Sequence, residues 1–139
     1  MEPFDPAELP AIRGEIRTDD AALAQASQDW GHIVQARPRT VVRPTLAADV
    51  AAILEFAAAR DIPVAPRGAG HSPFGQGQTD GGIVLDMTGM AAVHRVTGED
   101  VTVEAGARWR DVLAATVRRH LTDLGYVTRC QRVGVTSCQ

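Results

Sequence analysis

The chain has 139 residues, of which 45% are hydrophobic, and a formal net charge of -3. This length fits one globular domain, and charges of both signs are scattered, without the basic patch of a nucleic-acid-binding protein. No segment approaches the roughly 20 apolar residues of a membrane span, and no leader is recognisable, so we expect a cytoplasmic protein with no nucleic-acid or membrane partner. Cys130 and Cys138 are too few for a disulfide framework or a four-ligand zinc site, so no metal is expected.

The first half of the chain predicts one strand–helix–strand unit after an N-terminal arm of residues 1–20. Within residues 46–60 the apolar side chains follow the i, i+3, i+4, i+7 spacing of a buried helical face, and Thr45 is the expected N-cap. Segments 40–43 and 62–65 are each followed by a proline and are expected strands, because a residue before proline favours extended backbone. Such a unit closes with parallel strands, so its second strand leads directly into a glycine-rich run.

Three further strands and one helix are predicted downstream. Short apolar runs flanked by turn residues indicate strands at 83–86, 93–96 and 101–105, and helical spacing returns over residues 108–121. The last segment, 122–139, has no clear period and is interpreted as a divergent tail. Together these elements predict an α+β fold, with a small mixed β-sheet and flanking helices.

Residues 65–82 form the densest glycine run, with six glycines around His71. Neither common phosphate-binding pattern fits it. Pro73 stands where the dinucleotide-binding pattern needs its third glycine, and Gln76 stands where the Walker pattern needs lysine. The run still has the property that both patterns share, which is that glycines let consecutive backbone N–H groups converge on an anion. An imidazole, which titrates near neutral pH, also offers a nitrogen nucleophile.

Seven stretches of sequence resemble one known family. The flavin-binding domain of the vanillyl-alcohol oxidase and p-cresol methylhydroxylase (PCMH) family carries similar sequence, and the cytokinin-dehydrogenase-like oxidases are the most similar group within it. The stretches are Trp30-Gly31, Val42-Arg43-Pro44, Asp49-Val50, Arg67-Gly68-Ala69-Gly70-His71-Ser72, Gly75-Gln76-Gly77, Gly81-Gly82-Ile83-Val84-Leu85-Asp86-Met87 and Val103-Glu104-Ala105-Gly106-Ala107-Arg108-Trp109. The resemblance implies the first subdomain of a PCMH-type FAD-binding fold, in part, over residues 21–121.

The resemblance also implies FAD as the cofactor. In that family the loop holds the FAD pyrophosphate through backbone N–H groups, and the histidine at the place of His71 forms a covalent bond to the flavin 8α-methyl carbon. The positions that match the family's cofactor contacts are Arg67, Gly68, Ala69, Gly70, His71, Ser72 and Gln76. The alternative is an ordinary glycine-rich turn in which a backbone carbonyl satisfies His71. For Arg67, pairing with phosphate and capping of the loop's carbonyls are both open.

The implied function is the FAD-binding portion of an FAD-dependent oxidoreductase that oxidises a small organic substrate with covalently bound flavin. By the same resemblance, Asp123 matches the substrate base of cytokinin dehydrogenases; the alternative is an ordinary solvated aspartate after a helix. The rest of the family's flavin domain and its substrate domain do not follow, so we expect a truncated and incomplete enzyme. The alternative is a non-catalytic remnant or a subunit that needs a partner chain. Apolar faces at 83–85 and 101–103 are expected to be exposed, which would favour such a partner or self-association.

Two pairs of side chains receive structural interpretations. Trp30 and Trp109 are expected to pack in the core or in a lid rather than to act as stacking platforms. Cys130 and Cys138 are interpreted as free surface thiols, and Cys130 is not expected to form a second link to flavin.

Overall fold

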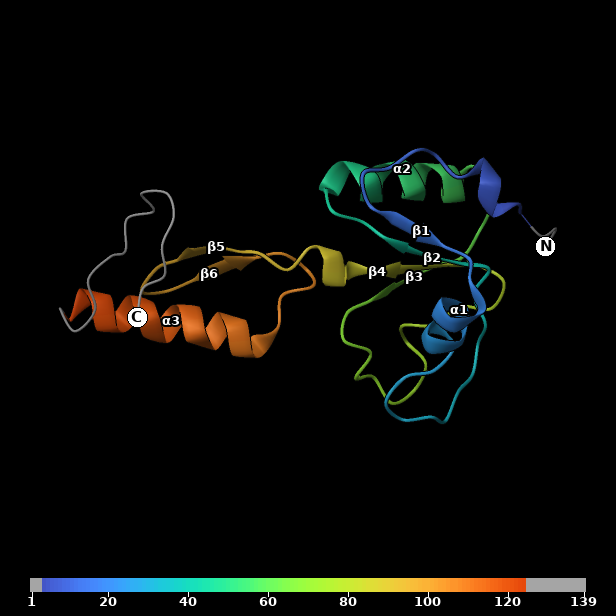
Figure 1. Ribbon diagram of the computed structural model, residues 1–139. Coiled ribbons are helices and arrows are strands. Elements are labelled where there is room, and N and C mark those ends of the chain that lie inside the picture. Colours follow the sequence, from blue (N-terminus) through green and yellow to red (C-terminus); the bar gives the residue numbers. More distant parts are fainter. Residues whose placement is uncertain (1–3, 125–139) are drawn as a thin grey trace.

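The computed structural model of the protein describes residues 4–124 and has the predicted α+β architecture (Figure 1). Figure 1 shows two parts, a sheet of four strands flanked by two helices and a two-stranded hairpin beside a long helix. The elements are η1 (Pro6–Glu8), β1 (Glu15–Arg17), α1 (Asp20–Ala26), β2 (Thr40–Arg43), α2 (Ala47–Ala58), β3 (Val64–Arg67), β4 (Ile83–Asp86), η2 (Met87–Gly89), β5 (Val93–Val96), β6 (Val101–Val103) and α3 (Trp109–Asp123).

The four-stranded sheet has the order β1-β2-β4-β3. Strands β2 and β3 both run parallel to β4, as predicted for the strand–helix–strand unit, and β1 is antiparallel to β2. Strand β4 lies between β2 and β3, so the two strands joined through α2 are not neighbours. The glycine-rich run leaves the carboxyl end of β3, two residues later than the sequence indicated, and returns the chain into the centre of the sheet.

Both faces of this sheet are covered, and this contradicts one prediction. Ile83 and Leu85 pack with α2, whereas Val84 packs with α1 on the other face, because side chains alternate along a strand. Ile83 and Val84 are fully buried and Leu85 is 3% exposed, so the prediction of an exposed apolar face at 83–85 is wrong. On β6, in contrast, Val103 is 40% exposed, as expected for that strand.

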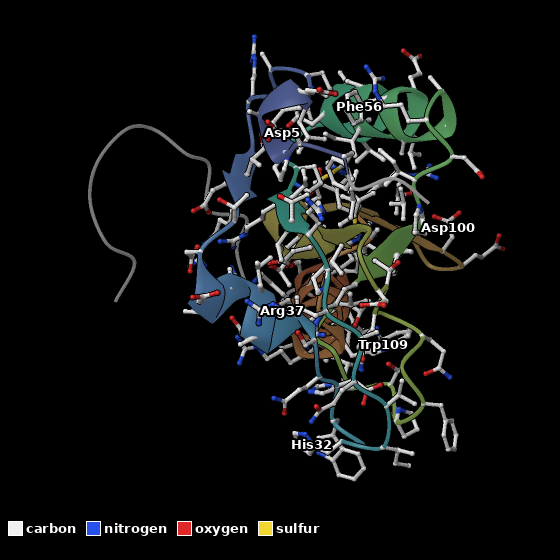
Figure 2. The ribbon with its side chains drawn as sticks, turned by 90° about the vertical axis from the view of Figure 1, so that its right-hand side faces the viewer. Asp5, His32, Arg37, Phe56, Asp100 and Trp109 are labelled. Atoms are coloured by element: carbon white, nitrogen blue, oxygen red, sulfur yellow. The ribbon has the colours of Figure 1, made fainter. Side chains whose placement is uncertain are left out.

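Residues 4–20, interpreted from sequence as an arm, take part in the sheet and the core. Strand β1 pairs with β2 through Glu15–Arg17. Phe4 packs edge-on against Phe56 of α2, with ring centroids 6.3 Å apart, and Figure 2 shows Phe56 on the α2 side of the sheet. The N-terminal segment therefore supplies part of the cover that keeps the central strand away from water.

Helix α2 begins one residue later than predicted, and Thr45 is not its N-cap. Instead, the carboxylate of Asp49 in the first turn accepts hydrogen bonds from the backbone N–H groups of Thr45 (2.9 Å), Leu46 (3.2 Å) and Arg13 (3.0 Å). The bonds from Thr45 and Arg13 outweigh burial and hold the pKa of Asp49 below its ordinary value. Asp49 thus joins the N-terminal segment to α2.

The second part consists of the antiparallel β5–β6 hairpin and α3. It is attached to the sheet through η2, where the Gly106 N–H donates to the Met90 carbonyl at 2.8 Å and a side chain at Gly106 would collide with the Met87 carbonyl. No residue of α3 is buried by the described part of the chain. None of the helices within residues 4–124 is long and apolar enough to cross a membrane.

Candidate cofactor-binding site

A cleft of about 730 Å³ lies between the sheet and the start of α3. The carboxyl ends of β3 and β4 open into it at Arg67 and Asp86, and Trp109 lines it from α3. Its volume falls in the range of about 300–1,000 Å³ that is typical of small-molecule sites. A position beyond the carboxyl ends of parallel strands is also where open sheets bind ligands.

The glycine loop presents free backbone donors beside this cleft. The N–H groups of residues 68–72 donate to no group in the described part of the chain, and Pro73 has no N–H. Gly70 has a φ of +74°, a conformation that L side chains rarely adopt, and Gly68, Ala69 and His71 on either side of it line the cleft. Five consecutive free donors at a strand end can hold an anion without a lysine.

A segment after α1 supports this loop from behind. The Trp30 N–H donates to the Gly70 carbonyl at 2.9 Å. The Arg67 guanidinium donates to the carbonyls of Ala26 (3.3 Å) and Gln28 (2.6 Å). The carbonyls that Arg67 caps therefore belong to the α1 segment and not, as the capping interpretation expected, to the loop, and pairing of Arg67 with phosphate stays a prediction.

Asp29, in the same segment, was not identified from sequence. It is 3% exposed, and its carboxylate accepts hydrogen bonds from Ser72 Oγ (3.0 Å), the Gly75 N–H (2.7 Å) and the Gly31 N–H (3.1 Å). Burial acts to raise the pKa of Asp29, but these hydrogen bonds act in the opposite direction and leave the pKa below its ordinary value. The bond to Gly31 is an Asx turn, the one local signal that sequence could have offered.

His71 is exposed and lines the cleft together with Gly68 and Ala69. Its imidazole makes no hydrogen bond within residues 4–124, so the alternative in which a carbonyl satisfies it is not what the structure shows there. The polar groups of Ser72 and Gln76 are engaged inside the structure, Ser72 with Asp29 and Gln76 as the acceptor for the Phe74 N–H at 3.2 Å. The structure therefore brings the first half of the matched loop to the cleft, with His71 at its edge.

Asp123 is not brought to this site. It lies at the last residue of α3, exposed, and accepts a hydrogen bond from Arg119 at 2.7 Å. The 15 residues of α3 place its two ends about 20 Å apart at 1.5 Å per residue, and the cleft lies at the Trp109 end. In the described part of the chain, Asp123 is thus a surface residue in an ion pair.

The packing interpretation of the two tryptophans is wrong. Trp30 is 72% exposed and Trp109 is 80% exposed, and Trp109 stands on the wall of the cleft. Cys130 and Cys138 lie outside the described residues. Among the residues that the structure describes, no group of three or more His, Cys, Asp or Glu side chains could hold a metal ion.

Comparison with known proteins agrees with this geometry. Residues 38–137 match the family described as FAD binding domain. The chain belongs to this FAD-binding domain family. An uncharacterized oxidoreductase of the fasciation locus of Rhodococcoides fascians is 48% identical over 111 residues, which cover 80% of this chain and 25% of that protein. Cytokinin dehydrogenase 10 of Oryza sativa subsp. japonica is 42% identical over 122 residues, which cover 80% of this chain and 22% of that protein.

Solved structures share the fold of this FAD-binding chain. The 6-hydroxy-D-nicotine oxidase of Arthrobacter nicotinovorans superposes with a TM-score of 0.69 at 29% identity, over 77% of this chain and 24% of the oxidase. The glucooligosaccharide oxidase of Acremonium strictum, described with a 6-S-cysteinyl, 8α-N1-histidyl FAD, superposes with a TM-score of 0.59 at 24% identity, over 81% of this chain and 23% of the oxidase. The chain spans about a quarter of the length of the relatives that it matches.

Proposed function

We propose that this chain is the FAD-binding part of an FAD-dependent oxidoreductase, and that the backbone N–H groups of residues 68–72 bind the FAD pyrophosphate. The main support for this proposal is that these five consecutive N–H groups have no hydrogen-bond acceptor in the described part of the chain and lie beside a cleft of ligand size. A diphosphate offers several anionic oxygens to such a row, and a hydrogen bond to a charged acceptor is stronger than one between neutral groups.

The charges around the cleft suit an anionic ligand. Its walls carry two carboxylates, those of Glu15 and Asp86, against five arginines, which are Arg17, Arg43, Arg67, Arg108 and Arg110. Within residues 4–124, neither Arg43 nor Arg108 forms an ion pair. Their positive charge would therefore be available to the ligand, and it would compensate for the cost of taking phosphate charge out of bulk water.

We further propose that His71 attaches the flavin covalently. Its imidazole is exposed, free of hydrogen bonds within the described residues and adjacent to the N–H groups that would hold the pyrophosphate. His71 would supply the imidazole nitrogen for this bond, and bound flavin would itself supply the two-electron oxidation that the bond requires. One C–H bond of the 8α-methyl group and the imidazole N–H bond would be broken, the two protons would pass to solvent or to the ring, and the flavin would be left in its two-electron reduced form. The histidyl link described for the oxidase of Acremonium strictum supports this proposal by likeness.

Bound FAD would supply two-electron oxidation of a small organic substrate, as in the dehydrogenase and oxidase relatives. The residues described here would bind and orient the cofactor. No role in proton transfer is proposed for Asp123, because it lies at the far end of α3 from the cleft.

Acid precipitation tests the attachment. The purified chain is incubated with FAD and precipitated with acid, and flavin absorbance is measured in the washed pellet for the parent, His71→Ala and His32→Ala. His32 is a control because it is also exposed but does not line the cleft, and Figure 2 shows it at the edge of the molecule, in the segment that follows α1. We expect flavin in the pellets of the parent and His32→Ala only. Equal pellet flavin in all three proteins would refute attachment through His71.

A further inference from the structure

Asp29 is the most buried ionisable side chain in the described part of the chain, and the proposed function does not use it. It is 3% exposed and does not line the cleft. A negative charge close to an anion-binding loop weakens anion binding, since like charges repel. The position of a buried carboxylate behind this loop therefore needs a reason other than ligand contact.

The contacts of Asp29 show what it holds. Oδ2 accepts from both Ser72 Oγ (3.0 Å) and the Gly75 N–H (2.7 Å), whereas Oδ1 accepts from the Gly31 N–H (3.1 Å). The first two donors belong to the second half of the glycine loop and the third to the segment behind it. An ionised carboxylate only accepts hydrogen bonds, so both of its oxygens suit this set of three donors, whereas an amide has one acceptor oxygen.

The neighbour of Asp29 fixes the centre of the loop. The Trp30 N–H donates to the Gly70 carbonyl at 2.9 Å. In a planar trans peptide the carbonyl and the following N–H point in opposite directions. Holding the Gly70 carbonyl against Trp30 therefore turns the His71 N–H away from the supporting segment. Asp29 on one side and Trp30 on the other set which face of the loop carries its free donors.

We propose that Asp29 is a positioning residue for the cofactor loop, whose carboxylate holds the Ser72–Gly75 half so that the N–H groups of residues 68–72 and the imidazole of His71 are oriented before the cofactor binds. The inference rests on the proposed function for its consequence in FAD binding. Its structural content, the docking of the loop on the segment that carries Asp29 and Trp30, can be measured without any ligand.

The ligand-free measurement uses the Trp30 amide as a reporter. Its hydrogen bond to Gly70 does not involve Asp29 directly, so its exchange rate reports loop docking rather than the loss of an acceptor. Hydrogen exchange is followed by NMR in the parent, Asp29→Asn and Asp29→Ala. We expect exchange at Trp30 to accelerate by about tenfold or more in Asp29→Ala, the equivalent of roughly one lost hydrogen bond to a charged group. In Asp29→Asn, which keeps one acceptor oxygen, the exchange rate of the Trp30 amide should lie between those of the parent and Asp29→Ala.

A matched control separates positioning from general stability. Asp49 is also buried, at 5% exposure, and its carboxylate also accepts several backbone hydrogen bonds, but at the start of α2 and away from the cleft. Asp49→Asn should destabilise the fold without changing the loop. At a temperature where all variants are fully folded, we expect FAD affinity to fall about tenfold or more in Asp29→Ala and to stay at the parent value in Asp49→Asn.

The outcomes are distinguishable. Parent FAD affinity with unchanged Trp30 exchange in Asp29→Ala and Asp29→Asn would overturn the inference and leave the proposed function standing. Equal losses of FAD affinity in the Asp29 and Asp49 variants would also overturn it, because a purely structural role predicts that result. If the parent chain binds no FAD, the proposed function fails, and the exchange rates of the Trp30 amide alone test the role of Asp29. If Asp29→Ala does not fold, the same measurements on Asp29→Asn test that role.

Discussion

Substitution of Gly70 by alanine probes the cofactor loop most sharply. Gly70 has a φ of +74°, and a Cβ built there would lie 2.5 Å from Nη2 of Arg67. Two other glycines serve as controls that separate the cost of the positive φ from the cost of the collision with Arg67. Gly81 also has a positive φ, +66°, but its Cβ would have no neighbour within 4 Å, and Gly68 has neither a positive φ nor a neighbour within that distance.

The expected magnitudes follow from these contacts. A left-handed φ costs a residue other than glycine about 1–2 kcal/mol. Moving the Arg67 guanidinium aside weakens its bonds to Ala26 and Gln28, and one hydrogen bond from a charged donor contributes about 1.5 kcal/mol at the lower end of its range. We therefore expect the free energy of unfolding to fall by up to about 3 kcal/mol in Gly70→Ala, about 1–2 kcal/mol in Gly81→Ala and near zero in Gly68→Ala.

Urea unfolding followed by circular dichroism gives the stabilities of the three variants, and titration of FAD fluorescence gives their affinities. Strain that the free loop retains is lost from stability. Strain that the loop relieves by moving must be restored when FAD binds and is lost from affinity instead, up to on the order of 100-fold for about 3 kcal/mol, whereas Gly81→Ala should bind FAD as the parent does. A combined loss of stability and FAD affinity in Gly70→Ala that is no larger than the loss of stability in Gly81→Ala would contradict this expectation.

Two further predictions concern other parts of the molecule. The pKa of Asp49 is lowered in the folded state, so its contribution to stability is fully present above about pH 4 and is lost as the pH falls through the lower, folded value. The gap in urea midpoint between the parent and Asp49→Asn should therefore be constant from pH 7 to pH 5 and narrow on further acidification, and a gap independent of pH would contradict this. Because Trp109 lines the cleft and Trp30 does not, Trp109→Leu should remove more of the flavin-induced quenching of tryptophan fluorescence than Trp30→Leu, and the reverse order would place the flavin elsewhere.

Local sequence patterns predicted the elements that depend on neighbouring residues. The apolar run at 83–86 and the helical spacing at 46–60 depend on side chains close in the chain, and β4 and α2 formed there. Helix α1 was missed although Asp19, its N-cap, precedes an alanine-rich stretch. Trp30 and Trp109 were misjudged because a large apolar side chain indicates burial only when another element is available to cover it.

Contacts between residues far apart in the sequence could not be predicted from local patterns. Burial of Ile83–Leu85 depends on Phe4 and α1, and the sequence analysis predicted neither the packing of Phe4 nor the helix α1. Asp29 meets Ser72 and Gly75 across 43 and 46 residues, and nothing in the local pattern at either end predicts that pairing. The loop itself was recognisable because its glycines and His71 lie within one short stretch.

Binding of the FAD pyrophosphate by the N–H groups of residues 68–72 can be observed in the amide spectrum of ¹⁵N-labelled protein. Titration with FAD should shift the amide protons of Gly68, Ala69, Gly70, His71 and Ser72 downfield together, because each N–H would gain a charged acceptor. ADP, which carries the same diphosphate, should shift the same set. Saturating binding of FAD that leaves these five amides at their positions in the free protein would contradict binding of the pyrophosphate by this loop.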